Sequence, residues 1–376
     1  NLNQARDELG SSGIATAALG FGGNVPPGTA NTEQWNGTNW TEVNNLSNVT
    51  IANTGGTGTT DLSLNAGGIV GGSASAISEE WNASTPVGAW STGGSLTGAA
   101  RAYQYSAGTQ GASFNAGGNA PSFTEGTAIT EIYDGTSWTE VSDLNTAKAR
   151  GGAAGTTTAG LVFGGVPGPK NETESWNGAS WTQVGTLTTA RAGRGQASAG
   201  TNTATLFFGG EAPPGASALT EKWNGTSWTE VGDLNTARKE INGAGTSTSA
   251  IAFGGRVDPP VSANTEIYNG SSWTEVNDLN TATYWAGCAG ASNSDAMKMG
   301  GNTAPSNNSS ATVETWNGTN WTEVADLTVA LVGTGGSGNT TAALAAGGTN
   351  TESGTYYSSS LEWNSTSTVT KTVSTD

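Results

Sequence analysis

The sequence predicts an all-β fold, an eight-bladed β-propeller with four antiparallel strands per blade. Three observations along the 376 residues predict it: eight Gly-Gly doublets, an aromatic residue beside Asn or Asp after each doublet, and a second Trp in seven of the eight units. The repeat spacing, from the low forties to the low fifties of residues, is that of a propeller blade. The doublets lie at 22–23, 67–68, 117–118, 164–165, 209–210, 254–255, 300–301 and 347–348, the first aromatics are Trp35, Trp81, Tyr133, Trp176, Trp223, Tyr268, Trp316 and Trp363, and the second Trp residues are Trp40, Trp90, Trp138, Trp181, Trp228, Trp273 and Trp321.

Each unit divides into four strands, A to D, and residues 234–278 show the division most clearly. Strand A runs from Leu234 towards Gly245, and strands B, C and D are expected at 249–253, 264–268 and 273–276. Asn-Gly or Asp-Gly joins strands C and D in six of the eight units. This dipeptide accepts positive φ at both central positions of a tight turn, so it predicts a β-hairpin.

The eight units divide the chain into one propeller domain, residues 1–376. The expected blades are approximately 1–43, 44–93, 94–141, 142–184, 185–231, 232–276, 277–324 and 325–376. The chain begins at strand A of the first unit and ends just after strand D of the last. We therefore expect the ring to close by side-chain packing between blades, with no strand exchanged between the two terminal blades.

The repeat resembles the kelch repeat, with a Gly-Gly doublet, an aromatic residue, a Trp and an Arg that opens the unit. The resemblance covers all eight units. Kelch units usually place about six residues between the aromatic residue and the Trp, whereas most units here have four. A hairpin shortened by two residues keeps its side chains on the same faces, so the resemblance implies a divergent kelch-like propeller. The repeat NGTSWTEV also resembles Thr/Asn/Gly-rich proteins predicted in marine bacteriophages and bacteria.

The composition excludes several classes of function. A net charge of −17 argues against a nucleic-acid partner, because phosphate binding needs a basic surface. The chain has no His and one Cys, so it lacks the ligands for a Cys-based zinc site or for the copper centre of kelch-like oxidases. No apolar run is long enough to cross a membrane as a helix. We expect no cofactor, no bound metal and no membrane insertion.

The candidate ligand-binding residues lie near the start of strand A. Adjacent strands alternate in direction, so the D–A and B–C loops share one face of the disc, and the B–C loops differ in every blade, as recognition loops commonly do. Eight of the 13 Lys and Arg residues fall at this position, with four aromatic residues in the same segments. Among the 14 Trp residues, Trp285 alone lies outside the two repeat columns. The candidates are Arg6, Arg101, Tyr103, Tyr105, Lys148, Arg150, Arg191, Arg194, Arg238, Lys239, Tyr284 and Trp285.

A structural interpretation of the same residues stands beside the functional one. Each basic residue could pair with the Glu of strand C in its own blade or bond to loop carbonyls, in which case it would hold the blade together. The repeated Trp residues are better explained by packing between blades than as a set of lectin sites.

The sequence supports three functions. The first is a non-catalytic recognition or adhesion module on a virion or in the extracellular space, which binds a glycan or a surface protein through the D–A/B–C face. The second is a structural subunit that contacts other subunits of a virion or extracellular assembly. The third is a sialidase-like glycoside hydrolase built on Arg101, Arg191, Arg238, Tyr103 and Glu240. The third is disfavoured because Asp134 and Gly135 are adjacent, whereas the sialidase turn separates them.

Overall fold

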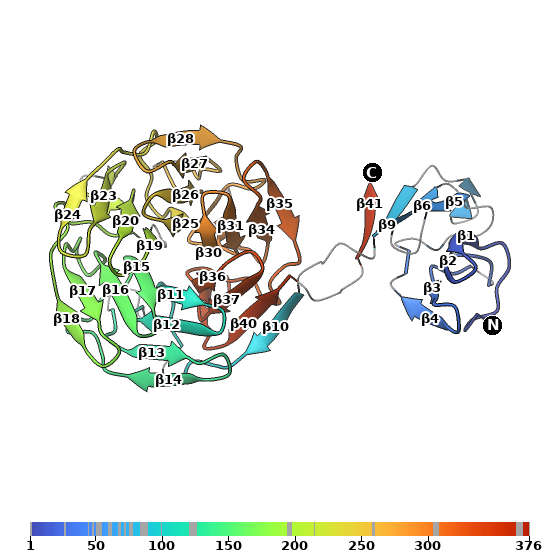
Figure 1. Ribbon diagram of the computed structural model, residues 1–376, viewed down its shortest axis with the longest axis horizontal. Coiled ribbons are helices and arrows are strands. Elements are labelled where there is room, and N and C mark those ends of the chain that lie inside the picture. Colours follow the sequence, from blue (N-terminus) through green and yellow to red (C-terminus); the bar gives the residue numbers. More distant parts are fainter. Residues whose placement is uncertain are drawn as a thin grey trace. The chain divides into compact units, whose positions relative to one another are not determined.

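The computed structural model shows an all-β protein whose strands form two compact units (Figure 1). One unit holds residues 89–365, and the other joins residues 1–88 to residues 366–376, where one domain was expected. The residues that the structure describes contain no α-helix, and none of their segments is a helix long and apolar enough to cross a membrane. The structure describes all residues except 1, 26–27, 44, 47–48, 50–54, 59–61, 67–68, 71–72, 75–77, 83–88, 99, 120–125, 194–197, 214, 258–259, 304–307, 366–370 and 376.

Residues 89–365 form six four-stranded antiparallel sheets, which are the blades of a propeller. Within each blade the four strands pair in the predicted order A, B, C, D. Five of the blades are built from consecutive segments: β11 (Tyr105–Thr109), β12 (Ala112–Ala116), β13 (Thr130–Tyr133) and β14 (Trp138–Val141); β15 (Gly152–Thr156), β16 (Ala159–Phe163), β17 (Thr173–Trp176) and β18 (Trp181–Gln183); β19 (Ser198–Gly200), β20 (Thr205–Phe208), β23 (Thr220–Trp223) and β24 (Trp228–Glu230); β25 (Asn242–Thr246), β26 (Ser249–Phe253), β27 (Thr265–Tyr268) and β28 (Trp273–Val276); β30 (Gly287–Ser292), β31 (Asp295–Met299), β34 (Val313–Trp316) and β35 (Trp321–Val324).

The sixth blade is completed by a strand from another part of the sequence. It contains β36 (Gly335–Gly338), β37 (Ala342–Ala346) and β40 (Ser360–Asn364), and its outer strand is β10 (Ala89–Gly93). β10 pairs antiparallel with β40, and Trp90 lies opposite Trp363, the same register that places Trp181 opposite Trp176 in a blade made of consecutive segments.

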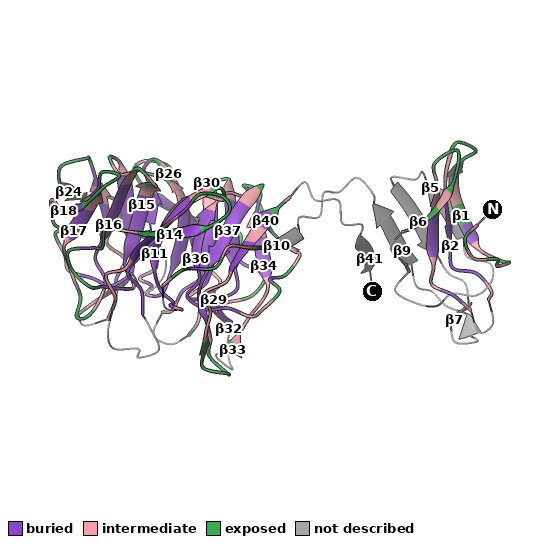
Figure 2. Ribbon diagram, turned by 90° about the horizontal axis from the view of Figure 1, so that it is seen from below, coloured by how far each residue is buried: buried purple, intermediate pink, exposed green. Residues whose placement is uncertain are grey.

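The six blades close into a ring. Their innermost strands β11, β15, β19, β25, β30 and β36 touch one another in this order, and β36 touches β11 (Figure 1). In Figure 2 the inner strands are buried and the exposed residues gather in the loops at the two faces and along the rim. We call residues 89–365 the six-blade ring.

Two expectations about closure change as a result. A single ring of eight blades is not confirmed, because only six of the eight four-stranded sheets pack together into a closed ring. The expectation that no strand is exchanged is wrong, because β10 precedes the first complete blade of the ring and completes the last one. Such an exchange joins the two ends of the ring by backbone hydrogen bonds as well as by side-chain packing.

The sequence carries the signal for this exchange. Trp81 and Trp90 are nine residues apart, whereas the paired aromatics of the other units are five apart. The segment between them has no Asn-Gly or Asp-Gly dipeptide and contains Pro86, so it does not encode the tight C–D hairpin. The last unit, after Trp363, lacks a second Trp of its own. Trp90 is therefore paired with Trp363 in the structure. The division of the sequence into consecutive units had paired it with Trp81 instead.

The other unit contains the two remaining four-stranded sheets, and we call it the two-blade unit. Its inner strands β1 and β5 touch each other. The C-terminal strand β41 pairs with β9, so this unit is also completed by a distant strand. The first sheet is β1 (Gly10–Ile14), β2 (Ala17–Phe21), β3 (Thr32–Trp35) and β4 (Trp40–Val43), and the second is β5 (Gly55–Gly58), β6 (Leu62–Ala66), β9 (Ser78–Asn82) and β41 (Lys371–Thr375).

Short strands outside the blades form small sheets in the B–C loops, and one of these sheets also includes β29 from a D–A loop. The group made by β29, β32 and β33 projects from one side of the six-blade ring (Figure 2). These strands are β7 (Ile69–Val70) with β8 (Ser73–Ala74), β21 (Glu211–Ala212) with β22 (Gly215–Ala216), β29 (Thr283–Tyr284) with β32 (Asn302–Thr303) and β33 (Asn308–Ser309), and β38 (Thr349–Asn350) with β39 (Thr355–Tyr356).

Adjacent blades are held together by the Trp that begins strand D. The Trp228 indole donates a hydrogen bond of 2.9 Å to the hydroxyl of Thr173 in the preceding blade, and its ring lies edge-on to Phe163, 4.7 Å between centroids. We call this contact the blade seam. Its hydrogen bond recurs from Trp138 to Ser360, from Trp181 to Thr130, from Trp273 to Thr220 and from Trp321 to Thr265, at 2.9–3.1 Å. Most repeated Trp residues are thus accounted for by packing.

The Gly-Gly doublets end strand B where it passes close to the neighbouring loop. Gly254 and Gly255 have φ of 64° and 94°, in the left-handed region that favours glycine. A Cβ atom on Gly255 would lie 2.8 Å from the carbonyl oxygen of Lys239. The doublets are therefore required by backbone conformation and by close packing.

Removal of β10 tests the exchanged closure. A fragment of residues 89–365 is expected to unfold in one cooperative transition, and residues 94–365 should have a clearly lower melting temperature because β40 loses its outer partner. Thermal unfolding followed by circular dichroism measures both. Equal melting temperatures would show that β10 does not close the ring.

Candidate functional site

The basic residues that open strand A are buried and paired with acidic residues. The side chains of Arg6, Arg101, Arg191 and Arg238, and of Lys148, have no exposed surface. Each forms an ion pair with the Glu of strand C in its own blade. The pairs are Arg6–Glu33 (3.3 Å), Arg101–Glu131 (2.6 Å), Lys148–Glu174 (2.9 Å), Arg191–Glu221 (3.2 Å) and Arg238–Glu266 (2.8 Å).

Arg238 shows what such a pair does. Its guanidinium donates hydrogen bonds to the carbonyl oxygens of Gly254 and Asn264, at 2.9 and 2.6 Å, as well as to Glu266. The other oxygen of the Glu266 carboxylate accepts hydrogen bonds from the backbone and side-chain amides of Asn235. The pair therefore fastens the D–A loop to the ends of strands B and C.

Burial determines the titration of these cations. Desolvation lowers the pKa of Arg191 to about 10, although the carboxylate of Glu221 acts in the opposite direction. Desolvation likewise lowers the pKa of Lys148 below its ordinary value, against the opposing effect of Glu174. A buried cation that is paired with a buried carboxylate is structural, because breaking the pair would leave an unpaired charge in a low-dielectric interior.

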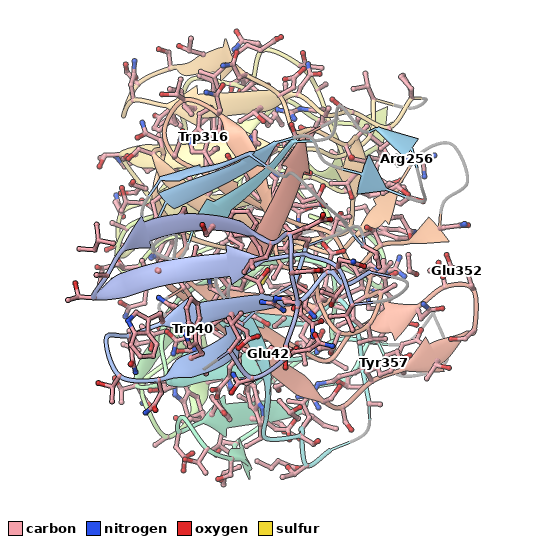
Figure 3. All side chains as sticks on the ribbon, turned by 90° about the vertical axis from the view of Figure 1, so that its right-hand side faces the viewer. Trp40, Glu42, Arg256, Trp316, Glu352 and Tyr357 are labelled. Atoms are coloured by element: carbon pink, nitrogen blue, oxygen red, sulfur yellow. The ribbon has the colours of Figure 1, made fainter. Side chains whose placement is uncertain are left out.

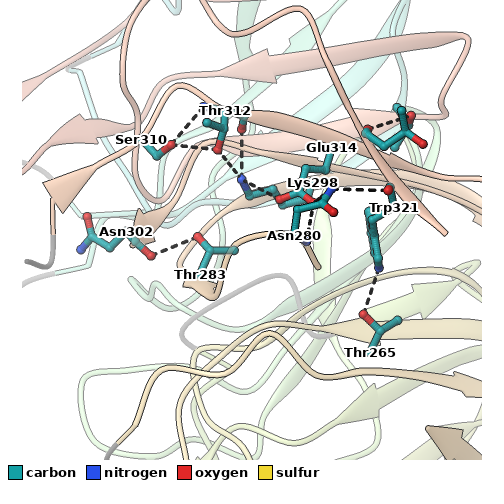
Figure 4. Close-up of polar contacts among 11 residues, drawn as sticks. Thr265, Asn280, Thr283, Lys298, Asn302, Ser310, Thr312, Glu314 and Trp321 are labelled. Atoms are coloured by element: carbon teal, nitrogen blue, oxygen red, sulfur yellow. Dashed lines mark hydrogen bonds and ion pairs between the residues drawn. The ribbon is translucent and has the colours of Figure 1, made fainter. Parts of the chain in front are cut away.

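Two blades of the six-blade ring have neither Arg nor Lys at this position and show how the cation is replaced. In one blade Thr283 takes its place, and Lys298 of β31 reaches the same carboxylate, with 3.7 Å from Nζ to Glu314 and a hydrogen bond of 2.6 Å to the Thr312 hydroxyl (Figure 4). In the sixth blade both charges are absent, and Leu331 and Leu361 are buried in one apolar cluster. Within the six-blade ring the cation and the anion are present or absent together, as expected for a structural pair.

Tyr105, a further sequence candidate, does not contribute to an exposed site. Tyr105 has no exposed surface, and its hydroxyl donates hydrogen bonds of 3.2 and 2.8 Å to the carbonyl oxygens of Ala149 and Gly164. Arg6 belongs to the two-blade unit. Arg194 lies outside the residues that the structure describes.

The remaining candidates meet above the centre of the six-blade ring. The rings of Tyr103 and Trp285 are 5.3 Å apart and nearly perpendicular, and the Arg150 guanidinium lies 4.8 Å from the Tyr103 ring and 6.0 Å from the Trp285 ring. These residues precede β11, β30 and β15, which belong to three different blades. Their side chains therefore converge from separate blades onto the mouth of the central channel.

Four more residues extend this group. Tyr284 stacks against Trp285 with 4.9 Å between centroids, and the Arg256 guanidinium lies 5.3 Å from the Tyr284 ring. Arg256 also pairs with Glu240 at 3.5 Å. Tyr356 packs against the cluster that contains Tyr103. We call Tyr103, Arg150, Glu240, Arg256, Tyr284, Trp285 and Tyr356 the mouth cluster.

The backbone aims the mouth cluster inward. Tyr103, Arg150, Glu240 and Trp285 all have φ between 57° and 62°, a left-handed conformation that is strained for residues other than Gly. Backbone hydrogen bonds between blades hold this conformation: Tyr103 N–H donates to Gly333, Arg150 to Tyr103, Trp285 to Glu240 and Gly333 to Trp285, at 2.7–3.4 Å. Gly333 leaves room for Tyr103, because a Cβ there would lie 2.6 Å from the Tyr103 ring.

Two hydrogen-bonding groups in the mouth cluster have no partner among the described residues. They are the hydroxyl of Tyr103, a residue only 5% exposed, and the indole nitrogen of Trp285. Burial raises the pKa of the Tyr103 hydroxyl, although Arg150 opposes the shift, so this group is protonated and can donate. Buried polar groups are nearly always satisfied, so two unsatisfied donors on neighbouring rings indicate the position of a ligand or of ordered water.

Deeper in the channel the wall is made of small residues. A hollow of about 100 Å³ is lined by the six inner strands with Gly, Ala, Ser and Cys288. Cys288 donates from Sγ to the carbonyl oxygen of Gly243 at 2.9 Å, and burial raises its pKa to about 12, so its thiol is not a reactive thiolate. The chemically varied side chains are therefore at the mouth of the channel, above this hollow.

Sequence reasoning found part of the mouth cluster. Tyr103, Arg150, Tyr284 and Trp285 were predicted, and Lys239 lies beside the cluster, where its N–H donates to the carbonyl of Arg256 at 3.0 Å. Arg256 and Tyr356 were missed as binding candidates. A signal for Arg256 exists, since it is the one Arg that directly follows a Gly-Gly doublet.

The mouth cluster lies on the predicted face. Arg256 and Tyr356 come from B–C loops and the other members from D–A loops. In Figure 3, Arg256, Glu352 and Tyr357, all from B–C loops, lie along one side of the six-blade ring, while Trp316, near a C–D turn, lies towards the other.

These features define a propeller-like repeat protein with an aromatic and basic cluster at the mouth of its channel. No protein-family model matches the chain, and a search of curated proteins finds no relative. Among the described residues no group of three or more His, Cys, Asp or Glu side chains could hold a metal ion.

Substitution of a buried ion pair tests its structural role. Arg238→Ala is expected to lower the free energy of unfolding by about 3–5 kcal/mol, because it leaves Glu266 charged and buried. The double variant Arg238→Leu/Glu266→Leu, which copies Leu331 and Leu361, should return to within about 1 kcal/mol of the wild type. Urea unfolding measures both, and a double variant no more stable than the single one would contradict the assignment.

Acid should weaken the ring through Glu131. Burial acts to raise the pKa of this carboxyl, but Arg101 and the hydrogen bonds from Thr97 and Gly98 outweigh it, so the pKa lies below its ordinary value of 4.5. The folded protein then binds fewer protons than the unfolded chain, and stability falls as the pH drops below about 4.5. Urea unfolding between pH 6 and 3 should show a shallower decline in Arg101→Leu/Glu131→Leu, and identical slopes would refute the prediction.

Proposed function

We propose that this protein is a non-catalytic recognition module that binds a glycan through the mouth cluster. The observation that carries the proposal is the pair of unsatisfied donors, Tyr103 Oη and Trp285 Nε1, on aromatic rings that converge beside Arg150. Trp285 stands outside the repeat that explains the other Trp residues, so the blade seam does not account for it.

The chemistry of the mouth cluster suits a hydroxyl-rich or acidic ligand. Binding sites combine apolar walls with a few placed polar groups, and the aromatic rings and donors here supply both. Sugars stack on indole rings through their C–H faces, and their hydroxyl or carboxylate oxygens accept hydrogen bonds from donors such as Tyr, Trp and Arg. Arg150 and Arg256 add positive charge to a strongly acidic chain, which favours an anionic group at this point.

We place the module on a virion or in the extracellular space and regard it as a divergent kelch-like propeller. The Thr, Ser, Asn and Gly-rich composition, the shortage of Lys and the acidic charge support a solvated, exposed particle component. The competing role, a subunit of a larger assembly, is supported by one observation in the two-blade unit, where Trp35 and Trp40 are only partly buried.

A glycan array with matched variants tests the proposal. The full chain should bind a defined group of glycans, Trp285→Ala should abolish binding, and Arg150→Gln should weaken it at least about tenfold, the effect of losing one charge-assisted hydrogen bond. Lys239→Gln, a cation beside the cluster, serves as the control and should bind as the wild type does. Equal melting temperatures would show that the variants remain folded.

Two results would contradict the proposal. One is a wild-type chain that binds no glycan on the array, and the other is a Trp285→Ala chain that binds as tightly as the wild type.

A further inference from the structure

The first blade of the two-blade unit has an aromatic face that is less covered than its equivalents in the six-blade ring. Trp35 and Trp40 have the same geometry as the equivalent pair Trp176 and Trp181, with 5.6 and 5.4 Å between centroids and interplanar angles of 39° and 42°. Trp176 and Trp181 are 2% and 5% exposed, whereas Trp35 and Trp40 are only partly buried. The blade is therefore built like its equivalents, but within the described residues of its own unit no blade packs on this side (Trp40 is labelled on β4 in Figure 3).

The six-blade ring shows what covers this face elsewhere. In the blade seam the Trp of strand D points towards the preceding blade and donates to a Thr or Ser hydroxyl there. Trp40 makes no such hydrogen bond to any described residue. The closed ring has no free blade face to offer, because each of its inner strands already touches two neighbours. A blade of the same kind, with a hydroxyl and an apolar surface in the same register, would complete this face.

The second blade of the two-blade unit carries the matching sequence and register. At the ring closure Trp138 donates to Ser360 at 2.9 Å and packs against Leu344 and Ala346. Ala346 and Leu344 lie opposite Ser360 and Glu362 in that sheet. The second blade repeats this arrangement, since Ala66 and Leu64 lie opposite Ser78 and Glu80, and it is likewise completed by a distant strand.

We propose that three copies of the chain assemble through their two-blade units into a second six-bladed ring. The Trp40 face of one copy docks on β6 and β9 of the next, as Trp138 docks on β37 and β40. The contact is heterologous, because each copy uses two different surfaces. The copies therefore close into a ring only if the rotation from one copy to the next is a whole fraction of a full turn. Six blades complete a turn in residues 89–365, so two blades advance about 120° and three copies close.

The mass of the full chain in solution tests the proposal. Size-exclusion chromatography with multi-angle light scattering should give about 112 kDa, three times the 37.5 kDa of one chain. Glutaraldehyde cross-linking should yield a trimer as its largest product. A monomer at 100 µM, or a dimer or tetramer as the main species, would overturn the proposal.

Variants of β4 locate the interface. Trp40→Ala is expected to raise the dissociation constant of the trimer at least about 100-fold, as the loss of a central Trp does at many interfaces. Trp40→Phe, which keeps an aromatic ring but loses the indole N–H, should weaken the trimer less. Thr41→Ala, at the exposed neighbouring position, is the control and should leave the trimer intact. A Trp40→Ala chain that remains trimeric would overturn the assignment of this face.

Discussion

The blade seam is the interaction on which the rest of the structure depends. A single blade cannot bury its Trp pair alone, so each blade needs a neighbour that presents a hydroxyl and an apolar surface in the right register. This requirement makes the ring close. It also explains why the closing blade, whose own sequence lacks a second Trp, takes its outer strand from residues 89–93.

The sequence predicted the local structure well and the closure poorly. Strand positions, the C–D hairpins and the packing role of the repeated Trp residues follow from short-range patterns such as Asn269-Gly270, and they are confirmed by the strand pairing. Closure depends on which blade receives β10, a choice between partners far apart in the sequence. The nine-residue step from Trp81 to Trp90 signalled it, but only as a departure from the repeat.

The candidate site was predictable to the extent that its residues break the repeat. Trp285 stood out because the two repeated aromatic positions of each unit account for every other Trp. The strand A cations, in contrast, follow the repeat, and they are buried partners of strand C carboxylates. Arg256 and Tyr356 come from B–C loops that have no common pattern, so their approach to the channel depends on loop conformation. The repeat thus explains the structural residues, and deviations from it mark the mouth cluster.

Disulfide trapping tests the exchanged closure most directly. Ser91 lies opposite Glu362 in the structure, whereas in a blade made of consecutive segments it would lie opposite Glu80. Facing residues in antiparallel strands have Cα atoms about 4.5–5.5 Å apart, within the range that a disulfide spans. We expect Ser91→Cys/Glu362→Cys to oxidise to an intramolecular disulfide and Ser91→Cys/Glu80→Cys to remain reduced, as measured by peptide mapping. The reverse pattern would contradict the exchanged closure.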